Sequence, residues 1–90
     1  MQTLATYPVY DAAYRLVQID HPSGTVYKWE WVEADGTVMF DSKAFRNEFD
    51  ALMDAAEDAR ATINDTQVSS EVYRSIVNSA ILSDSKEEED

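Results

Sequence analysis

The sequence predicts an α+β fold in which a three-stranded antiparallel meander packs against one long helix, followed by a second, shorter helix. Residues 13–41 read as three strands in series separated by turn residues, and Thr25–Val32 alternates with the period of two that is typical of strands. After residue 43 the apolar residues recur three and four positions apart, which is the period of a helix. A chain of 90 residues suits one small core, and we expect a single domain over residues 13–82.

The first two predicted strands are joined by a turn that holds a proline and a glycine. Ala13–Ile19 is rich in β-branched and aromatic residues, and it ends at the turn residues Asp20–Gly24. Thr25–Val32 alternates strictly, which predicts a half-buried strand. One face of this strand carries three aromatic rings: Tyr27, Trp29 and Trp31. We expect these rings to form the core beneath the long helix, because large aromatic side chains bury the most area.

A second turn and the N-terminal segment complete the predicted sheet. The Asp35-Gly36 pair is the strongest local sign of a hairpin, and it predicts a third strand over Thr37–Phe40. Pro8 interrupts the apolar run near the N-terminus and cannot donate to a sheet ladder. Residues 1–12 are therefore expected to form either an edge strand or a packed arm.

The first predicted helix runs from Lys43 to Thr62. Asp41 or Ser42 would supply the oxygen atom that caps its N-terminus. Its apolar stripe consists of Phe45, Phe49, Leu52, Ala56, Ala59 and Ile63. The polar pair that follows at residues 64–65 breaks the pattern and ends the helix.

The second predicted helix begins between Asp65 and Ser70, with Ser69 or Ser70 as its cap. Its apolar stripe consists of Val72, Tyr73, Ile76, Val77, Ala80 and Ile81. Residues 83–90 contain no apolar side chain, and they predict a disordered acidic tail.

Composition excludes several classes of partner. Eighteen acidic and seven basic residues give a formal net charge of −11, which opposes direct binding to nucleic acid or to an anionic membrane. The chain has no cysteine, so disulfides, thiolate nucleophiles and cysteine-bound metals are excluded. No apolar run approaches the roughly 18 residues of a membrane span, and the N-terminus lacks the basic flank of a signal peptide. We expect a soluble, cytoplasmic protein, in the host cytoplasm if a phage encodes it.

The segment from Tyr27 to Phe45 resembles the YegP-like family of small domains of unknown function. Trp29 and Trp31 match the aromatic pair of that family, Gly36 matches its turn glycine, and Ser42 lies near its helix-start serines. The resemblance lies within residues 13–60, the usual Tyr-Ser-Ser-Lys helix start is absent, and residues 64–90 have no counterpart. The resemblance implies a sheet followed by a helix. It implies no active site, because the family has none established.

Groups for catalysis are few. His21 is the single histidine, and its place beside Pro22 in a turn indicates a solvated side chain rather than a general base. The chain lacks a glycine-rich phosphate loop, a Gly-x-Ser-x-Gly elbow and a histidine pair at metal spacing. The helical acids do not follow the calcium-loop pattern. We therefore expect a protein that is not an enzyme and that binds no metal or cofactor.

The two tryptophans also allow a stacking platform for bases or sugars. The core interpretation is favoured, because both rings face the side that must meet the helix. Lys28 and Glu30 on the opposite face nearly cancel, so they form no track for phosphates.

Carboxylates on the long helix form the main candidate site. Asp50, Asp54, Glu57 and Asp58 are spaced to form a stripe opposite the apolar one, and Glu33 and Asp35 lie at the hairpin tip. Carboxylates four residues apart on a helix are about 6 Å apart, close to the spacing of successive phosphates on one nucleic-acid strand. The pattern predicts a surface that binds a basic protein. The alternative is that these acids only keep the helix solvated.

Size and charge resemble those of small acidic phage-encoded anti-defence inhibitors, such as the anti-restriction and anti-CRISPR proteins that mimic DNA. We therefore expect an inhibitor that binds a basic nuclease or nucleic-acid-binding complex, with carboxylates in place of phosphates. The alternative is a non-catalytic, YegP-like structural or accessory domain. Exposed sheet edges would also allow that domain to form a homodimer.

Overall fold

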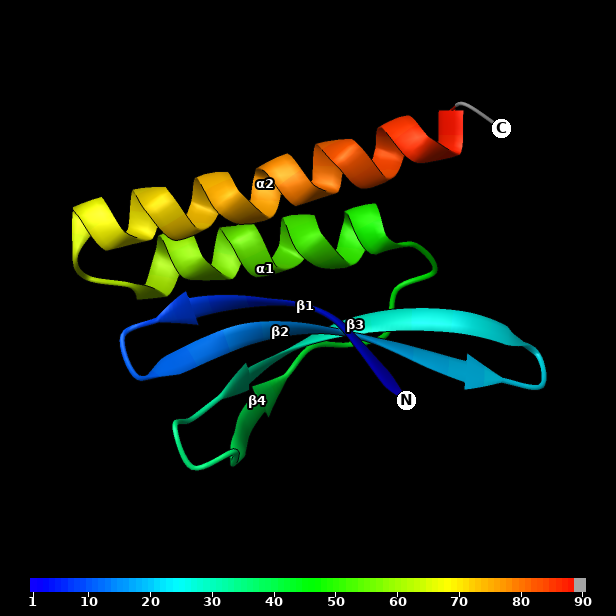
Figure 1. Cartoon of the computed structure of the whole chain (residues 1–90), viewed down its shortest axis with the longest axis horizontal. Coiled ribbons are helices and arrows are strands. Elements are labelled where there is room, and N and C mark those ends of the chain that lie inside the picture. Colours follow the sequence, from blue (N-terminus) through cyan, green and yellow to red (C-terminus); the bar gives the residue numbers. More distant parts are fainter. Residues whose placement is uncertain (89–90) are drawn as a thin grey trace.

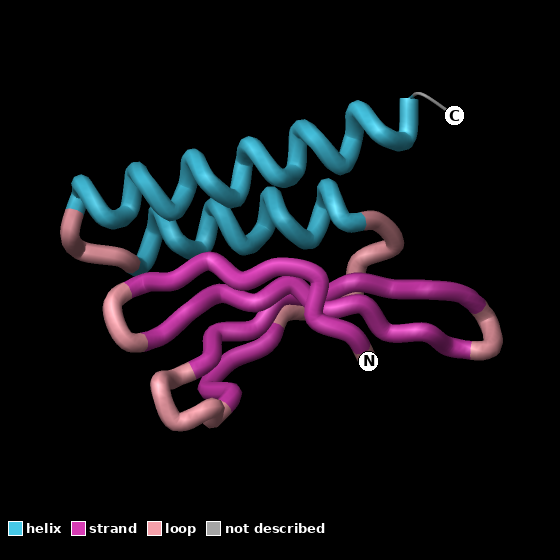
Figure 2. The backbone as a smooth tube through the Cα atoms, viewed as in Figure 1, coloured by secondary structure: helices cyan, strands magenta, loops and turns pink. Residues whose placement is uncertain are grey.

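The protein has two layers, an antiparallel sheet and a pair of helices that cover one face of it (Figure 1). A computed structural model describes residues 1–88, and side chains up to residue 84. The elements in chain order are β1 (Gln2–Val9), β2 (Ala12–His21), β3 (Gly24–Val32), β4 (Val38–Asp41), α1 (Glu48–Thr62) and α2 (Thr66–Glu88). The strands lie in the order β1-β2-β3-β4, so each pairs with its neighbour in sequence (Figure 2). The predicted α+β class is confirmed.

The sheet has four strands rather than the predicted three, because the N-terminal segment is the edge strand β1. It pairs with β2 from Gln2 opposite Gln18 to Val9 opposite Ala12, with an irregularity after Thr3. Pro8 fits there because an edge strand can direct a missing N–H away from the ladder. Of the two alternatives for residues 1–12, the edge strand is therefore the one observed.

The aromatic core lies between β2, β3 and the helices, as the alternation predicts. Tyr14 and Trp29 are only 2% and 3% exposed. The Tyr14 ring meets Trp29 and Trp31 edge to face, with centroids 5.4 Å and 4.9 Å apart. Such edge contacts suit the charge distribution of aromatic rings, so the three rings form a fixed platform under α1.

Helix α1 begins at Glu48 instead of Lys43, and Asn47 is its N-cap in place of Asp41 or Ser42. The Asn47 side chain accepts a hydrogen bond from the Asp50 N–H at 2.8 Å. The preceding residues are held along β3, because Phe45 and Tyr27 exchange two backbone hydrogen bonds of 2.7 Å and 2.8 Å. This pairing with a distant part of the chain overrides the local helical pattern of residues 43–47.

Helix α2 is the longer helix, with 23 residues against 15 in α1, so the prediction of a shorter second helix is wrong. It begins at Thr66, where the Asp65 carboxylate accepts from the N–H groups of Gln67 and Val68 and so caps the helix in place of Ser69 or Ser70. Small residues make the close packing with α1 possible: Ala51, Ala55, Ala56, Ala59 and Ala80 are all buried. Ile81, which was expected in the apolar stripe, is 53% exposed.

The predicted disordered tail is helical through residue 88, and residues 89–90 lie outside the described residues. Extending an existing helix costs little, because each further residue adds one hydrogen bond. The Ser83 hydroxyl also donates to the Glu48 carboxylate at 3.0 Å, which ties this end of α2 to the start of α1. Over the same described residues, neither helix is long and apolar enough to cross a membrane.

Candidate functional site

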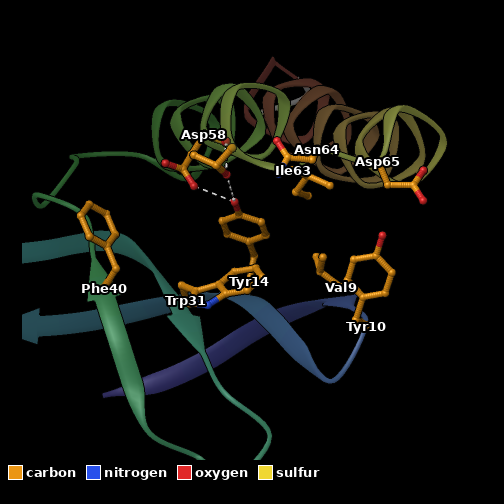
Figure 3. Close-up of a pocket in the computed structure, with 10 residues that line it drawn as sticks. Val9, Tyr10, Tyr14, Trp31, Phe40, Asp58, Ile63, Asn64 and Asp65 are labelled. Atoms are coloured by element: carbon orange, nitrogen blue, oxygen red, sulfur yellow. Dashed lines mark hydrogen bonds between the residues drawn. The ribbon is translucent and has the colours of Figure 1, made fainter.

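An open cavity of about 640 Å³ lies where the β1–β2 turn approaches the α1–α2 loop (Figure 3). Its lining residues come from five elements and two connections: Val9, Tyr10, Tyr14, Trp31, Phe40, Asp58, Thr62, Ile63, Asn64 and Asp65. The sheet side of the cavity is aromatic, whereas the helix side carries carboxylates and an amide. The site therefore offers an apolar floor with a charged upper rim.

The floor follows from the register of three neighbouring strands. Tyr14 on β2 lies opposite Trp31 on β3, and Trp31 lies opposite Phe40 on β4. Directly opposite residues share a face of the sheet, so these rings form one row on the helix-covered side. Helix α1 packs over β2 and β3 and α2 over β1, but neither packs over β4. The row therefore runs from the buried core to open solvent, and Phe40 is 55% exposed.

Asp58 is held at the rim by the core tyrosine. The Tyr14 hydroxyl donates to the Asp58 carboxylate at 2.6 Å and lies 3.5 Å from the Thr62 hydroxyl. Burial, and then the hydrogen bond to Asp58, raise the pKa of Tyr14. The phenol therefore stays protonated at neutral pH and keeps Asp58 fixed.

Asp54 makes the equivalent contact one helical turn earlier. The Trp29 indole N–H donates to the Asp54 carboxylate at 2.8 Å. One turn of α1 rises by about 5–6 Å, and Tyr14 and Trp29 are offset by two positions along the ladder, or roughly 7 Å. The two aromatic donors thus match two carboxylates four residues apart on α1. Buried tryptophan and tyrosine need such polar partners.

The predicted stripe opposite the core is therefore wrong for two of its members. Asp54 and Asp58 lie on the flank of α1 that meets the sheet, and each accepts a hydrogen bond from it. Asp50, Asp54 and Glu57 are exposed, as predicted, and Asp58 is half-buried. Asp50 sits at the start of α1 beside the Asn47 cap, and therefore at the far end of the helix from Asp58.

The hairpin acids Glu33 and Asp35 line a second depression of about 530 Å³ between the β1–β2 and β3–β4 turns. Asp11 and Met39 line it as well, and these residues adjoin Tyr10 and Phe40 of the first cavity. Thr37 donates its backbone N–H to Asp35 at 2.9 Å, and hydrogen bonds from Thr37 hold the pKa of Asp35 below its usual value. Asp35 is therefore ionised at neutral pH.

One end of the molecule thus carries two depressions whose lining residues are neighbours in sequence at two points, and we call it the acidic end. Its carboxylates are Asp11, Glu33, Asp35, Asp58 and Asp65. The sequence predicted Glu33, Asp35 and Asp58 as binding residues but missed Asp11 and Asp65. Asp11 lies within the predicted arm or edge strand of residues 1–12, and Asp65 lies in the polar pair that ends the first predicted helix. Only the fold shows that their turns lie at the same end (Figure 1).

Four basic side chains are engaged with partners that line neither depression. Arg15 pairs with the buried Glu30 at 2.6 Å, and Lys28 pairs with Asp41 at 2.8 Å. Lys43 lies over the Phe45 ring and Arg60 over the Tyr73 ring. Among the residues with described side chains, no lysine or arginine lines either depression. Carboxylates there accept hydrogen bonds, but none of them forms an ion pair with a side chain that the structure describes.

The two depressions combine aromatic faces with carboxylates. Within residues 1–84, no cluster of three or more histidine, aspartate or glutamate side chains could hold a metal ion. His21 is exposed at the end of β2, beside the β2–β3 turn. Comparison of the chain with protein-family models, curated proteins and solved structures found no match.

Proposed function

We propose that the protein is a small acidic binding module whose acidic end binds a basic surface of a nuclease or another nucleic-acid-binding protein and so blocks its phosphate groove. The observation that carries the proposal is the row of Tyr14, Trp31 and Phe40 in a cavity that also holds carboxylates. Among the residues with described side chains, no lysine or arginine lines this cavity. An arginine side chain stacks on aromatic faces and pairs with carboxylates through the same planar group. The acidic end offers both partners, because Phe40 is exposed and Trp31 half-buried beside the carboxylates, whereas Tyr14 is buried beneath them.

Charge also supports a basic partner. A chain with a net charge of −11 attracts a positively charged protein over a distance, and this speeds association. The basic groove of a nucleic-acid-binding protein is a surface that gains affinity from anions. Glu33, Asp35 and Asp58 keep their proposed role from the sequence, and Asp11 and Asp65 join them.

Charge reversal at the hairpin tip tests the proposal. The double variant Glu33→Lys, Asp35→Lys changes two exposed residues of the acidic end. We expect it to weaken binding roughly 100-fold, because each lost charge pair is worth on the order of 1–2 kcal/mol. The wild-type protein would first be used to capture the basic partner from a cell lysate. Binding of the wild type and of the double variant to that partner would then be measured by calorimetry in low and high salt.

The matched control is Asp20→Lys, Glu71→Lys, which reverses two exposed acids outside both depressions. Duplex DNA is added as a competitor, and it should displace the protein from its partner. Equal affinities of the two double variants, or a ternary complex with DNA, would contradict the proposal.

A second candidate is a non-catalytic structural or accessory domain of the YegP-like type, in which the acids serve the fold and solubility. The hydrogen bonds from Trp29 to Asp54 and from Tyr14 to Asp58 favour it, because they give two of the predicted binding acids a structural role. In that case the double variant Glu33→Lys, Asp35→Lys should bind other proteins no more weakly than the wild type does.

A further inference from the structure

Strand β4 presents an apolar and uncovered edge. All four of its residues are exposed, with Val38, Met39 and Phe40 at 42%, 61% and 55%. Soluble proteins protect such edges with charges, prolines or covering helices. The other edge strand, β1, has Pro8 and is packed by α2, whereas β4 has neither. The two edges of this sheet are therefore unequal.

We infer that β4 is a docking edge that an extended, arginine- or lysine-bearing segment of the partner joins as a fifth strand. This rests on the proposed function, since it takes the partner to be basic, and it states how that partner is held. Addition of a strand to a sheet edge draws affinity from main-chain hydrogen bonds and specificity from the pockets for alternate side chains.

The edge is longer than the four residues of β4. The Ser42 N–H donates to the Trp29 carbonyl at 2.9 Å, and Phe45 pairs with Tyr27, so the chain follows β3 to residue 45. In an antiparallel ladder alternate residues face the partner strand. Since Ser42 faces β3, the N–H and carbonyl of Asp41 face the free edge. An incoming strand would therefore find main-chain groups to pair with at Asp41.

The same register connects the edge to the cavity. Phe40 shares the helix-covered face with Trp31 and Tyr14. A residue of the incoming strand opposite Phe40 would lie on that face too, at the open side of the cavity shown in Figure 3. An arginine there would stack on the Phe40 ring with its charge directed to the Asp58 rim.

Charge selects the basic segment over a second copy of this chain. Pairing of β4 with β4 of another copy would bring together two sets of the turn acids Glu33 and Asp35, whereas the Asp41 charge is already paired with Lys28. Like charges opposite one another destabilise a strand pair, and each chain carries −11 overall. A strand with arginine or lysine at alternate positions places cations against these acids.

The test uses a short synthetic peptide that alternates Arg and Val, titrated into the full-length, isotope-labelled protein. Two methylated versions carry N-methyl groups on one or the other alternate set of backbone nitrogens. We expect nuclear magnetic resonance shifts at β4 and the cavity residues. One methylated peptide should lose at least tenfold in affinity while the other retains it, because only one set of N–H groups faces β4.

Protein variants provide a matched pair at the edge. Asp41→Pro removes the N–H that faces outward, whereas Asp41→Asn removes the same charge and keeps the N–H. We expect the proline variant to bind the peptide at least tenfold more weakly than the asparagine variant. The spread of the amide resonances in the nuclear magnetic resonance spectrum checks that both variants fold. If the proline variant does not fold, the comparison of the two methylated peptides tests strand addition instead.

Equal binding of the two methylated peptides overturns strand addition, and so does the absence of binding by the Arg-Val peptide. Equal binding of a Glu-Val peptide overturns the charge selection. A molecular mass in solution twice that of the single chain would indicate a dimer with a second copy on the edge. That result would also refute the inference. Salt-dependent capture of a basic partner that ignores methylation would leave the proposed function intact while this inference fails.

Discussion

Tyr14 combines a structural and a positioning role at the level of the single residue. Its ring contacts two tryptophans, and its hydroxyl holds Asp58 at the rim of the cavity. Sequence alternation was enough to predict the aromatic face. It could not predict that Asp54 and Asp58 turn toward the sheet, because a helical stripe specifies a face of α1 and not the donors that face will meet.

Removing the Tyr14 hydroxyl is expected to destabilise the fold modestly. Tyr14→Phe keeps the ring contacts but leaves Asp58 without its donor, which costs about 1–2 kcal/mol of unfolding free energy. Urea denaturation would measure the loss. Tyr10→Phe is the control, since Tyr10 is 71% exposed and its change should be within about 0.5 kcal/mol. Equal losses in the two variants would argue against a specific role for the Tyr14 hydroxyl.

Alkaline pH should reveal the same contact. The folded state raises the pKa of Tyr14 above the ordinary value of 10.0, so the folded protein holds this proton more tightly than the unfolded chain. The resulting stabilisation is complete below pH 10 and is lost as the pH rises further. Unfolding free energy should therefore fall more steeply above pH 10 in the wild type than in Tyr14→Phe. Parallel pH profiles would contradict this assignment.

At the scale of elements, local signals predicted the hairpins well and the helix ends poorly. Strand alternation and the Asp35-Gly36 turn act over neighbouring residues, and β2 and β3 lie where the pattern puts them. The start of α1 depends instead on the backbone bonds between Phe45 and Tyr27, which join distant residues. The C-terminal part of α2 has no apolar pattern to detect, yet the preceding packed turns carry the helix through it.

The observed N-cap gives a direct test of the start of α1. Asn47→Ala removes the oxygen that accepts the Asp50 N–H, and we expect a loss of about 1 kcal/mol in unfolding free energy. Asn47→Asp keeps a capping oxygen and should retain most of the stability. Thermal or urea unfolding of the three proteins would decide, and a loss in Asn47→Asp as large as in Asn47→Ala would show that the cap is not the cause.

At the scale of the whole molecule, the acidic charge opposes folding as well as guiding association. A net charge of −11 on a chain of 90 residues creates self-repulsion that salt screens. We expect the melting temperature to rise as sodium chloride is added at neutral pH, as followed by circular dichroism. A melting temperature that falls over the same range would show that the Arg15 and Lys28 ion pairs outweigh the repulsion.

The length of α2 has a practical consequence for handling the protein. Its 23 residues span about 35 Å, close to the longest dimension of 38 Å, and it starts beside the acidic end. The last turn of α2 therefore lies at the opposite pole of the molecule (Figure 1). A fluorophore or surface tether attached at the end of α2 leaves the cavity and β4 accessible, whereas an insertion in the β3–β4 turn would lie in the second depression and beside β4.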